Sequence, residues 1–128
     1  MRRAGSLQAP VLTARYLSGP KKEAELVRLR EAFTKGGFQV MGEIGLQYEG
    51  ISPSDPTVDQ YFALAEELDI PVGIHMGTGG SGRANITTPK FRGSMGNPLL
   101  LEELLAIAPS LTILCKVQFC LQTVFFRS

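Results

Sequence analysis

Several kinds of residue are scarce in this sequence of 128 residues, which contains no tryptophan, one histidine and two cysteines. An excess of charge is also missing, because 13 basic and 12 acidic residues leave a net charge of +1. We therefore expect no binding to nucleic acid through bulk charge. Cys115 and Cys120 lie in neither CxxC nor histidine-rich spacing, which argues against a zinc knuckle and favours a reduced, cytoplasmic setting.

Long uninterrupted apolar runs are absent as well. Segment 111–126 is apolar, but polar residues interrupt it and it is shorter than the roughly 20 residues that cross a bilayer. The arginines at positions 2 and 3 are not followed by a signal-peptide core of roughly 7–15 apolar residues. The sequence therefore predicts no transmembrane helix, no signal peptide and no membrane partner.

Glycine and proline are frequent, and the segments between them show two kinds of periodicity. Apolar residues recur with helical spacing in 20–35, 56–68 and 98–108, whereas 38–47, 70–77 and 111–114 are typical of strands. Residues 1–19 show no clear period and are expected to form an irregular lead-in. Helices placed between successive strands predict parallel pairing through right-handed crossovers, and hence an α/β fold.

Helix boundaries follow from local signals. Pro20 suits the first position of the first helix, and a pair of glycines at 36–37 ends it. Asp55 followed by proline, and Asn97 followed by proline, are expected to start the second and third helices. The predicted apolar stripe of the first helix consists of Leu26, Leu29 and Phe33, widened by Val27 and Ala32.

The strands predict two faces. In 38–47 one parity is aliphatic and is expected to pack under the helices, while the other parity carries Glu43. In 70–77 the aliphatic residues alternate with Gly73, His75 and Gly77. The apolar positions of this face are Phe38, Val40, Ile44 and Leu46 in the first strand, and Ile70, Val72, Ile74 and Met76 in the second.

Glu43 and His75 both fall near the carboxyl ends of their strands, where parallel α/β folds place their functional sites. Neighbouring strands run about 4.8 Å apart, so the two side chains are expected to meet. They are suited to share a metal ion, to act as a catalytic acid–base pair, or to form a buried hydrogen bond with no further role. The spacing leaves these alternatives open, and a catalytic zinc normally needs three protein ligands.

The connection 77–96 is rich in glycine and polar residues. Its "GTGGSG" lacks the lysine of a phosphate-binding loop, so we expect a flexible lid over the strand ends. Arg83, Lys90 and Arg92 are suited to hold an anionic substrate, although solvated loop charges are the commoner case. Tyr48, just beyond the first strand, is a second candidate substrate-binding residue beside Arg83.

Three segments resemble the amidohydrolase superfamily, in particular its amidohydrolase-related branch of metal-dependent hydrolases. They are "VMGEIGLQYEG", "YFALAEELDIPVGIHMGTGG" and "NPLLLEELLAIAPSLTIL", and the resemblance covers roughly residues 20–114. It implies about half of a TIM (β/α)8 barrel, with "GEIG" as strand four and "GIHMG" as strand five. It also implies a divalent metal, commonly zinc, with His75 as a ligand and Glu43 at a position that ligates metal in some branches.

The family's H-x-H pair on strand one and its aspartate on strand eight have no counterpart here. No histidine follows "LTIL", where the chain reads "LCKVQFCLQTVFFRS", and residues 115–128 form a divergent apolar tail. We therefore expect a truncated or frame-shifted gene product.

The resulting hypothesis is a piece of a metal-dependent hydrolase that hydrolyses or decarboxylates a small carboxylated or amide-bearing substrate. His75 and Glu43 would be its catalytic and metal-binding residues, with Tyr48 and Arg83 against the substrate. One alternative is a catalytically silent α/β piece that associates with itself through open sheet edges. Another is a metal-free acid–base pair formed by Glu43 and His75.

Overall fold

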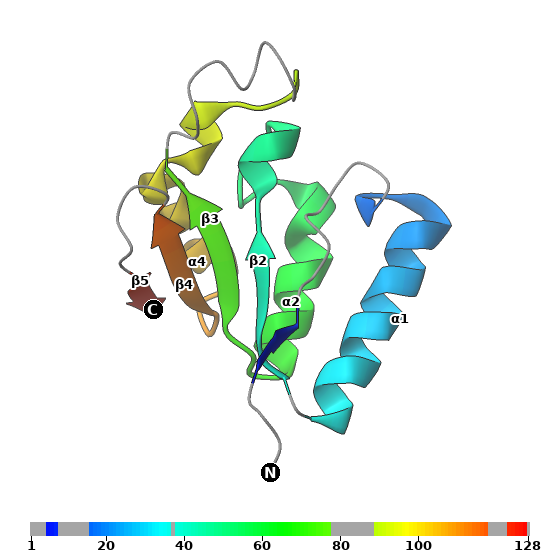
Figure 1. Ribbon diagram of the computed structural model, residues 1–128. Coiled ribbons are helices and arrows are strands. Elements are labelled where there is room, and N and C mark those ends of the chain that lie inside the picture. The colour runs from blue at the N-terminus through cyan, green and yellow to red at the C-terminus, as the bar shows by residue number, and fades with distance from the viewer. Residues whose placement is uncertain (1–4, 8–15, 37, 78–88, 118–122, 128) are drawn as a thin grey trace.

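The computed structural model describes residues 5–7, 16–36, 38–77, 89–117 and 123–127 (Figure 1). Strands and helices alternate along most of the chain. The strands are β1 (Gly5–Leu7), β2 (Phe38–Ile44), β3 (Val72–Met76), β4 (Thr112–Val117) and β5 (Thr123–Arg127). The α-helices are α1 (Gly19–Lys35), α2 (Asp59–Glu67) and α4 (Leu101–Ile107). Short 3₁₀ helices are η2 (Leu46–Glu49), η3 (Pro56–Val58), η4 (Gly93–Gly96) and η5 (Pro98–Leu100).

The strands form one sheet in the order β1-β2-β3-β4-β5. Neighbouring strands from β1 to β4 run parallel, and β5 pairs with β4 in the antiparallel sense. The predicted α/β class is confirmed, and the open parallel sheet with its helices is consistent with part of a (β/α)8 barrel. β1 lies in the segment 1–19, for which the sequence predicted no regular structure, and β5 lies in the apolar tail.

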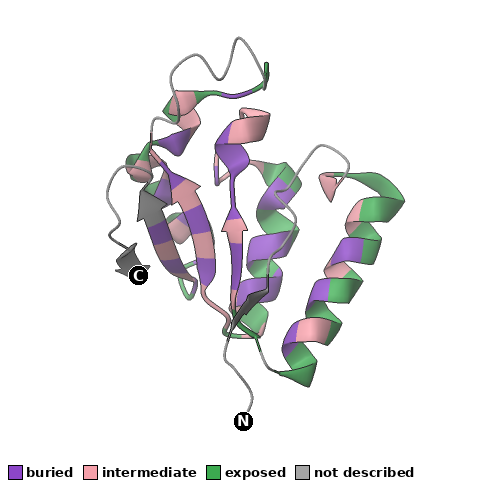
Figure 2. Ribbon diagram, viewed as in Figure 1, coloured by how far each residue is buried: buried purple, intermediate pink, exposed green. Residues whose placement is uncertain are grey.

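The described helices pack on one face of the sheet and enclose the hydrophobic core between themselves and the strands (Figure 2). On β3 the buried residues are Val72, Ile74 and Met76, as the alternation predicted. Facing them are Leu29 and Phe33 from α1, Tyr61, Phe62 and Ala65 from α2, and Leu101 and Leu104 from α4. The alternate residues of β3, Gly73 and His75, therefore face the opposite side of the sheet.

β2 departs from the predicted alternation. Met41 pairs with Val72 and Ile44 pairs with Ile74, so β2 uses three residues where β3 uses two. Met41 and Ile44 consequently both lie in the core, whereas Val40 contacts the position that a side chain on Gly73 would take, on the other face. The predicted aliphatic face was wrong for the first half of the strand, because one extra residue reverses the parity.

Gly42 sits in this irregularity with φ +154°. A Cβ on Gly42 would lie 2.6 Å from the carbonyl oxygen of Gly73 on β3. Only glycine allows the two strands to approach so closely here. The close approach brings the Glu43 end of β2 against β3. The peptide bond between Gly42 and Glu43 is cis.

The predicted helix starts are confirmed. The side chain of Asp55 accepts a hydrogen bond from the Thr57 backbone N–H at 2.9 Å, and that of Asn97 accepts one from the Leu99 N–H at 3.0 Å. A proline follows each cap, and each first turn is a 3₁₀ helix that leads into the α-helix. Gly36 ends α1 with φ +80°.

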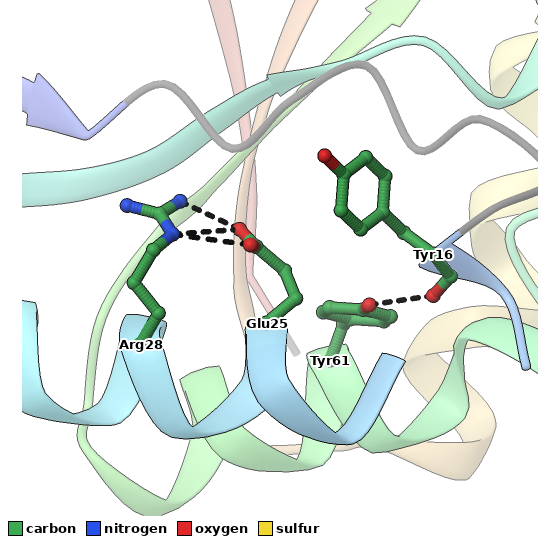
Figure 3. A network of polar contacts seen from close by, with 4 residues as sticks. All are labelled: Tyr16, Glu25, Arg28 and Tyr61. Carbon is green, nitrogen blue, oxygen red and sulfur yellow. Dashed lines mark hydrogen bonds and ion pairs between the residues drawn. The ribbon is translucent and has the colours of Figure 1, made fainter. Parts of the chain in front are cut away.

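The inner side of α1 holds a polar network that the sequence did not predict (Figure 3). Glu25 is 7% exposed, and both of its carboxylate oxygens accept hydrogen bonds from the Arg28 guanidinium. The hydrogen bond to Glu25 raises the pKa of Arg28. Nearby, the Tyr61 hydroxyl donates to the backbone carbonyl of Tyr16 at 2.6 Å. Val27, expected in the apolar stripe, is instead 58% exposed.

Among the described residues, no helix is both long enough and apolar enough to cross a membrane.

Candidate functional site

Glu43 and His75 meet at the carboxyl ends of β2 and β3. The His75 Nδ1 atom lies 2.7 Å from Glu43 Oε1, within hydrogen-bond distance. The His75 side chain is 15% exposed and the Glu43 side chain 36% exposed. His75 reaches this face because its neighbours Ile74 and Met76 point into the core. The structure thus brings together the two residues that the sequence singled out, while their chemical role stays a prediction.

The second ring nitrogen of His75 has a different environment. Nε2 is buried and has no hydrogen-bond partner among the residues that the structure describes. When a neutral imidazole donates its Nδ1–H to a carboxylate, Nε2 carries the lone pair. A buried lone pair without a partner costs free energy unless a ligand or a proton donor reaches it. The His75 ring therefore offers one nitrogen to Glu43, and its second nitrogen is buried with no partner among the described residues.

Tyr48 forms a wall beside the imidazole. Its ring centroid lies 6.1 Å from that of His75, and the two planes are tilted by 35°. The rings of Tyr48 and Phe91 also pack edge to face, with their centroids 5.3 Å apart. The structure therefore places Tyr48 at the strand ends, where the sequence expected it. Phe91 was missed, although it is the only aromatic residue in the connection 77–96.

The last part of that connection, Pro89–Gly96, is here called the return segment, and it packs on η2 above the strand ends (Figure 1). The Arg92 N–H donates to the Gln47 carbonyl and the Gly77 N–H donates to the Gly96 carbonyl, each at 2.9 Å. Gly50 has φ +68°, and a Cβ on it would lie 2.5 Å from the Lys90 carbonyl oxygen. The return segment is thus fixed to the ends of both strands.

Two of the basic residues of the connection, Lys90 and Arg92, contact other parts of this protein. The Lys90 Nζ pairs with Glu49 Oε2 at 3.9 Å, and the Arg92 guanidinium donates to the carbonyls of Pro89 and Phe91. Both cationic side chains therefore have partners in or next to the return segment, although that of Lys90 is 66% exposed. Arg83 and most of the predicted lid lie outside the described residues.

Gln47 is a residue of the site that the sequence analysis missed. It is 1% exposed, and neither its Oε1 nor its Nε2 atom has a hydrogen-bond partner in the described part of the chain. A glutamine just after a strand gives no distinctive sequence signal. Its burial results from the return segment, which folds back over η2.

The metal ion that the resemblance implies can be tested against the donor atoms present. Within the described ranges, no group of three or more histidine, cysteine, aspartate or glutamate side chains could hold a metal ion. An imidazole and a carboxylate are both suitable zinc ligands, and two ligands of a tetrahedral zinc lie about 3.4 Å apart. The 2.7 Å between His75 Nδ1 and Glu43 Oε1 is a little shorter. The pair would supply two ligands if Nδ1 faced an ion after a small outward movement of one side chain, or one ligand, Nε2, if Nδ1 kept its contact with Glu43.

Cys115 does not belong to the site. It is a free cysteine and 1% exposed, within the core face of β4. Burial raises the pKa of its thiol, which disfavours the reactive thiolate at neutral pH. The prediction that Cys115 is a small core residue is confirmed, and Cys120 lies outside the described residues.

Comparison with protein families gives one finding that bears on these residues. A family model described as "Amidohydrolase" matches residues 8–115, which include β2, β3, α2, α4 and the whole return segment. Comparisons with curated proteins and with solved structures gave no match.

Proposed function

This chain belongs to the amidohydrolase family, and we propose from this premise that it contributes the His75–Glu43 part of a metal-dependent hydrolytic site. The observation that supports the proposal best is the pairing of His75 Nδ1 with Glu43 Oε1 at 2.7 Å, next to a buried Nε2 without a partner in the described residues. This pair lies at the carboxyl ends of the parallel strands, where α/β-barrel enzymes have their active sites.

In the proposed site His75 is the first metal ligand and Glu43 the second. A divalent ion, most simply zinc, would activate a water molecule or polarise a substrate oxygen when bound. If the ion were held by Nε2 instead, Glu43 would orient the imidazole, since its carboxylate would accept the hydrogen bond from Nδ1–H. The ring of Tyr48, itself packed against Phe91, would shield one side of the imidazole from water and so strengthen electrostatic interactions there.

The proposed reaction is hydrolysis of a small amide-bearing or carboxylated substrate, with decarboxylation as the variant for a carboxylated one. Tyr48 is proposed to contact the substrate, because its ring borders the imidazole. Arg83 keeps its proposed role as a partner for a substrate carboxylate. Cytoplasmic localisation also remains part of the proposal.

Calorimetric titration with zinc tests the site. We expect weak binding by the wild-type chain and none by His75→Ala, because His75 is the one imidazole in the sequence. Glu49→Gln is the matched control, since Glu49 is a neighbouring carboxylate that pairs with Lys90 instead of His75. Equal zinc affinity in wild type and His75→Ala would refute the proposal.

Glu43→Gln separates the two roles of Glu43. The amide oxygen of glutamine still accepts a hydrogen bond from His75 Nδ1, but it is a much poorer zinc ligand than a carboxylate. A large loss of zinc affinity in Glu43→Gln therefore indicates direct ligation. A small loss, with a larger one in Glu43→Ala, indicates that Glu43 acts by orienting His75.

The short contact between Glu43 and His75 also favours a second candidate, a metal-free acid–base pair. Turnover measured after exhaustive treatment with a chelator distinguishes the two. Activity on amide or ester substrates that survives metal removal and disappears in His75→Ala would support the acid–base pair. Activity that returns only with added zinc would support the metal site.

A further inference from the structure

The Gln47 side chain is the feature of the site that the proposed function leaves unexplained. It is 1% exposed, and both polar atoms of its amide lack a hydrogen-bond partner among the described residues. Burial of an unpaired amide costs free energy that an apolar residue of the same size would not. Proteins tolerate such costs chiefly where a site needs the residue.

Three segments meet at this amide. A Cβ added to Gly96 would collide with both Gln47 Oε1 and the carbonyl oxygen of Gly77. The glutamine side chain of η2, the end of β3 and the end of η4 are therefore packed around one point. The missing side chain of Gly96 leaves the space that the amide occupies.

Two backbone hydrogen bonds join the same three segments to one another. The Gln47 carbonyl accepts the Arg92 N–H, and the Gly96 carbonyl accepts the Gly77 N–H. Gln47 thus holds the return segment with its backbone at one end and touches it with its side chain at the other. The amide therefore packs where the ends of β3 and of the return segment meet.

The residues that follow β2 and β3 both lie close to the His75 imidazole. Gly77 follows His75 by two residues, so its position fixes where β3 stops. Tyr48 is the immediate neighbour of Gln47, and its ring lies against the His75 ring. No described hydrogen bond joins the Gln47 amide to His75. An influence of Gln47 on the imidazole must therefore pass through Gly77 and Tyr48.

We propose that Gln47 is a positioning residue, whose amide is wedged against Gly77 and Gly96 and sets the orientation of the His75 imidazole. The inference rests on the proposed function, in which His75 binds the metal ion. It also makes a statement about the metal-free chain, since the wedge is present without an ion. The polar amide is retained at a cost in stability because the geometry of the site depends on it.

Substitution by methionine tests this role, because methionine has a similar length and no groups that need hydrogen bonds. Gln47→Met is compared with wild type and with Gln60→Met, which changes an exposed glutamine on α2. Three quantities are measured: the midpoint of thermal unfolding, the zinc dissociation constant by calorimetry, and the imidazole ¹H–¹⁵N signals of His75 in the metal-free protein.

We expect Gln47→Met to melt at the same temperature as wild type or higher, to bind zinc about tenfold more weakly, and to shift the His75 signals. Gln60→Met should leave the zinc affinity and the signals unchanged. Gly96→Ala displaces the same amide by adding a Cβ and should also weaken zinc binding and shift the signals.

Several results would overturn the inference. One is a Gln47→Met variant with unchanged zinc affinity or unchanged His75 signals. Another is a variant that loses thermal stability together with affinity, because Gln47 would then be only structural. If the wild-type chain binds no zinc, the proposed function fails, and the His75 signals alone decide: a shift supports the wedge and no shift overturns it.

Discussion

The two faces of the sheet differ in what their side chains do. Towards the helices, Val72, Ile74 and Met76 of β3 are apolar and at most 1% exposed. On the other face, the same strand carries His75, which meets Glu43 of β2 and whose second ring nitrogen has no partner among the described residues. Because neighbouring residues of a strand point to opposite faces, adjacent positions can serve stability and chemistry separately. Substitutions on the two faces should therefore have separable effects.

The largest effect is expected from a pair of neighbours on the two faces. Ile74→Ala removes a completely buried side chain and should cost about 2–5 kcal/mol of unfolding free energy. His75→Ala should cost only about 1 kcal/mol, since it loses one hydrogen bond on a partly exposed face. Urea unfolding measures both. A His75→Ala variant as unstable as Ile74→Ala would contradict the division between the faces.

An intermediate effect is expected where the register of the two faces changes, at Gly42. Gly42→Ala places a Cβ 2.6 Å from the Gly73 carbonyl and should cost about 1–3 kcal/mol. Gly19→Ala is the matched control, because Gly19 also has a positive φ of 72° but no atom within 4 Å of the added Cβ. The difference between the two variants in urea unfolding measures the strand contact. Equal costs would mean that β2 and β3 separate without penalty.

The smallest effect concerns a polar group on the helix side. Tyr61→Phe removes the hydrogen bond to the Tyr16 carbonyl and should cost about 1 kcal/mol at pH 8. Burial, with a smaller contribution from Glu25, raises the pKa of Tyr61 from 10 to about 12. A folded pKa above the unfolded one gives stability that is complete below pH 10 and is lost as the pH rises through 12.

Urea unfolding between pH 8 and 12 measures this loss. Wild type should lose stability more steeply above pH 10 than Tyr61→Phe, which lacks the ionisable group. Parallel curves for the two proteins would show that Tyr61 titrates normally in the folded state. This prediction sharpens the comparison, because it measures what one buried polar group on the core side contributes to stability.

The sequence predicted β3 well and β2 only in part, for a physical reason. In β3 the apolar residues alternate without interruption, and burial follows the pattern. In β2 the extra residue near Gly42 reverses the faces, so that Met41 is buried and Phe38 is 37% exposed. A prediction from periodicity assumes a regular strand. The extra residue in β2 depends on how β3 packs beside it, and a single sequence carries no information on that packing.

The candidate site shows the same limit. Glu43 and His75 were predictable because polar residues at the ends of apolar strands are conspicuous. Gln47 and Phe91 were not, since their roles arise when the return segment folds back onto η2. Glu25 was not predictable either, since a charged residue on a helix is ordinarily solvated, whereas its carboxylate is buried and held by Arg28. Contacts between distant segments decided the places of Gln47 and Phe91, and packing of α1 against the core decided the burial of Glu25.

The hydrogen bond between Gly77 and Gly96 has a consequence for how this protein can vary. It closes the connection at its base, so the two ends stay together whatever lies between them. The entropy of closing a loop rises only with the logarithm of its length, and doubling the length costs about 0.6 kcal/mol. Residues inserted into or deleted from the part of the connection before the return segment, 78–88, should therefore cost little free energy of unfolding. The length of the connection can then vary while the ends of β3 and η4 stay together beside the imidazole.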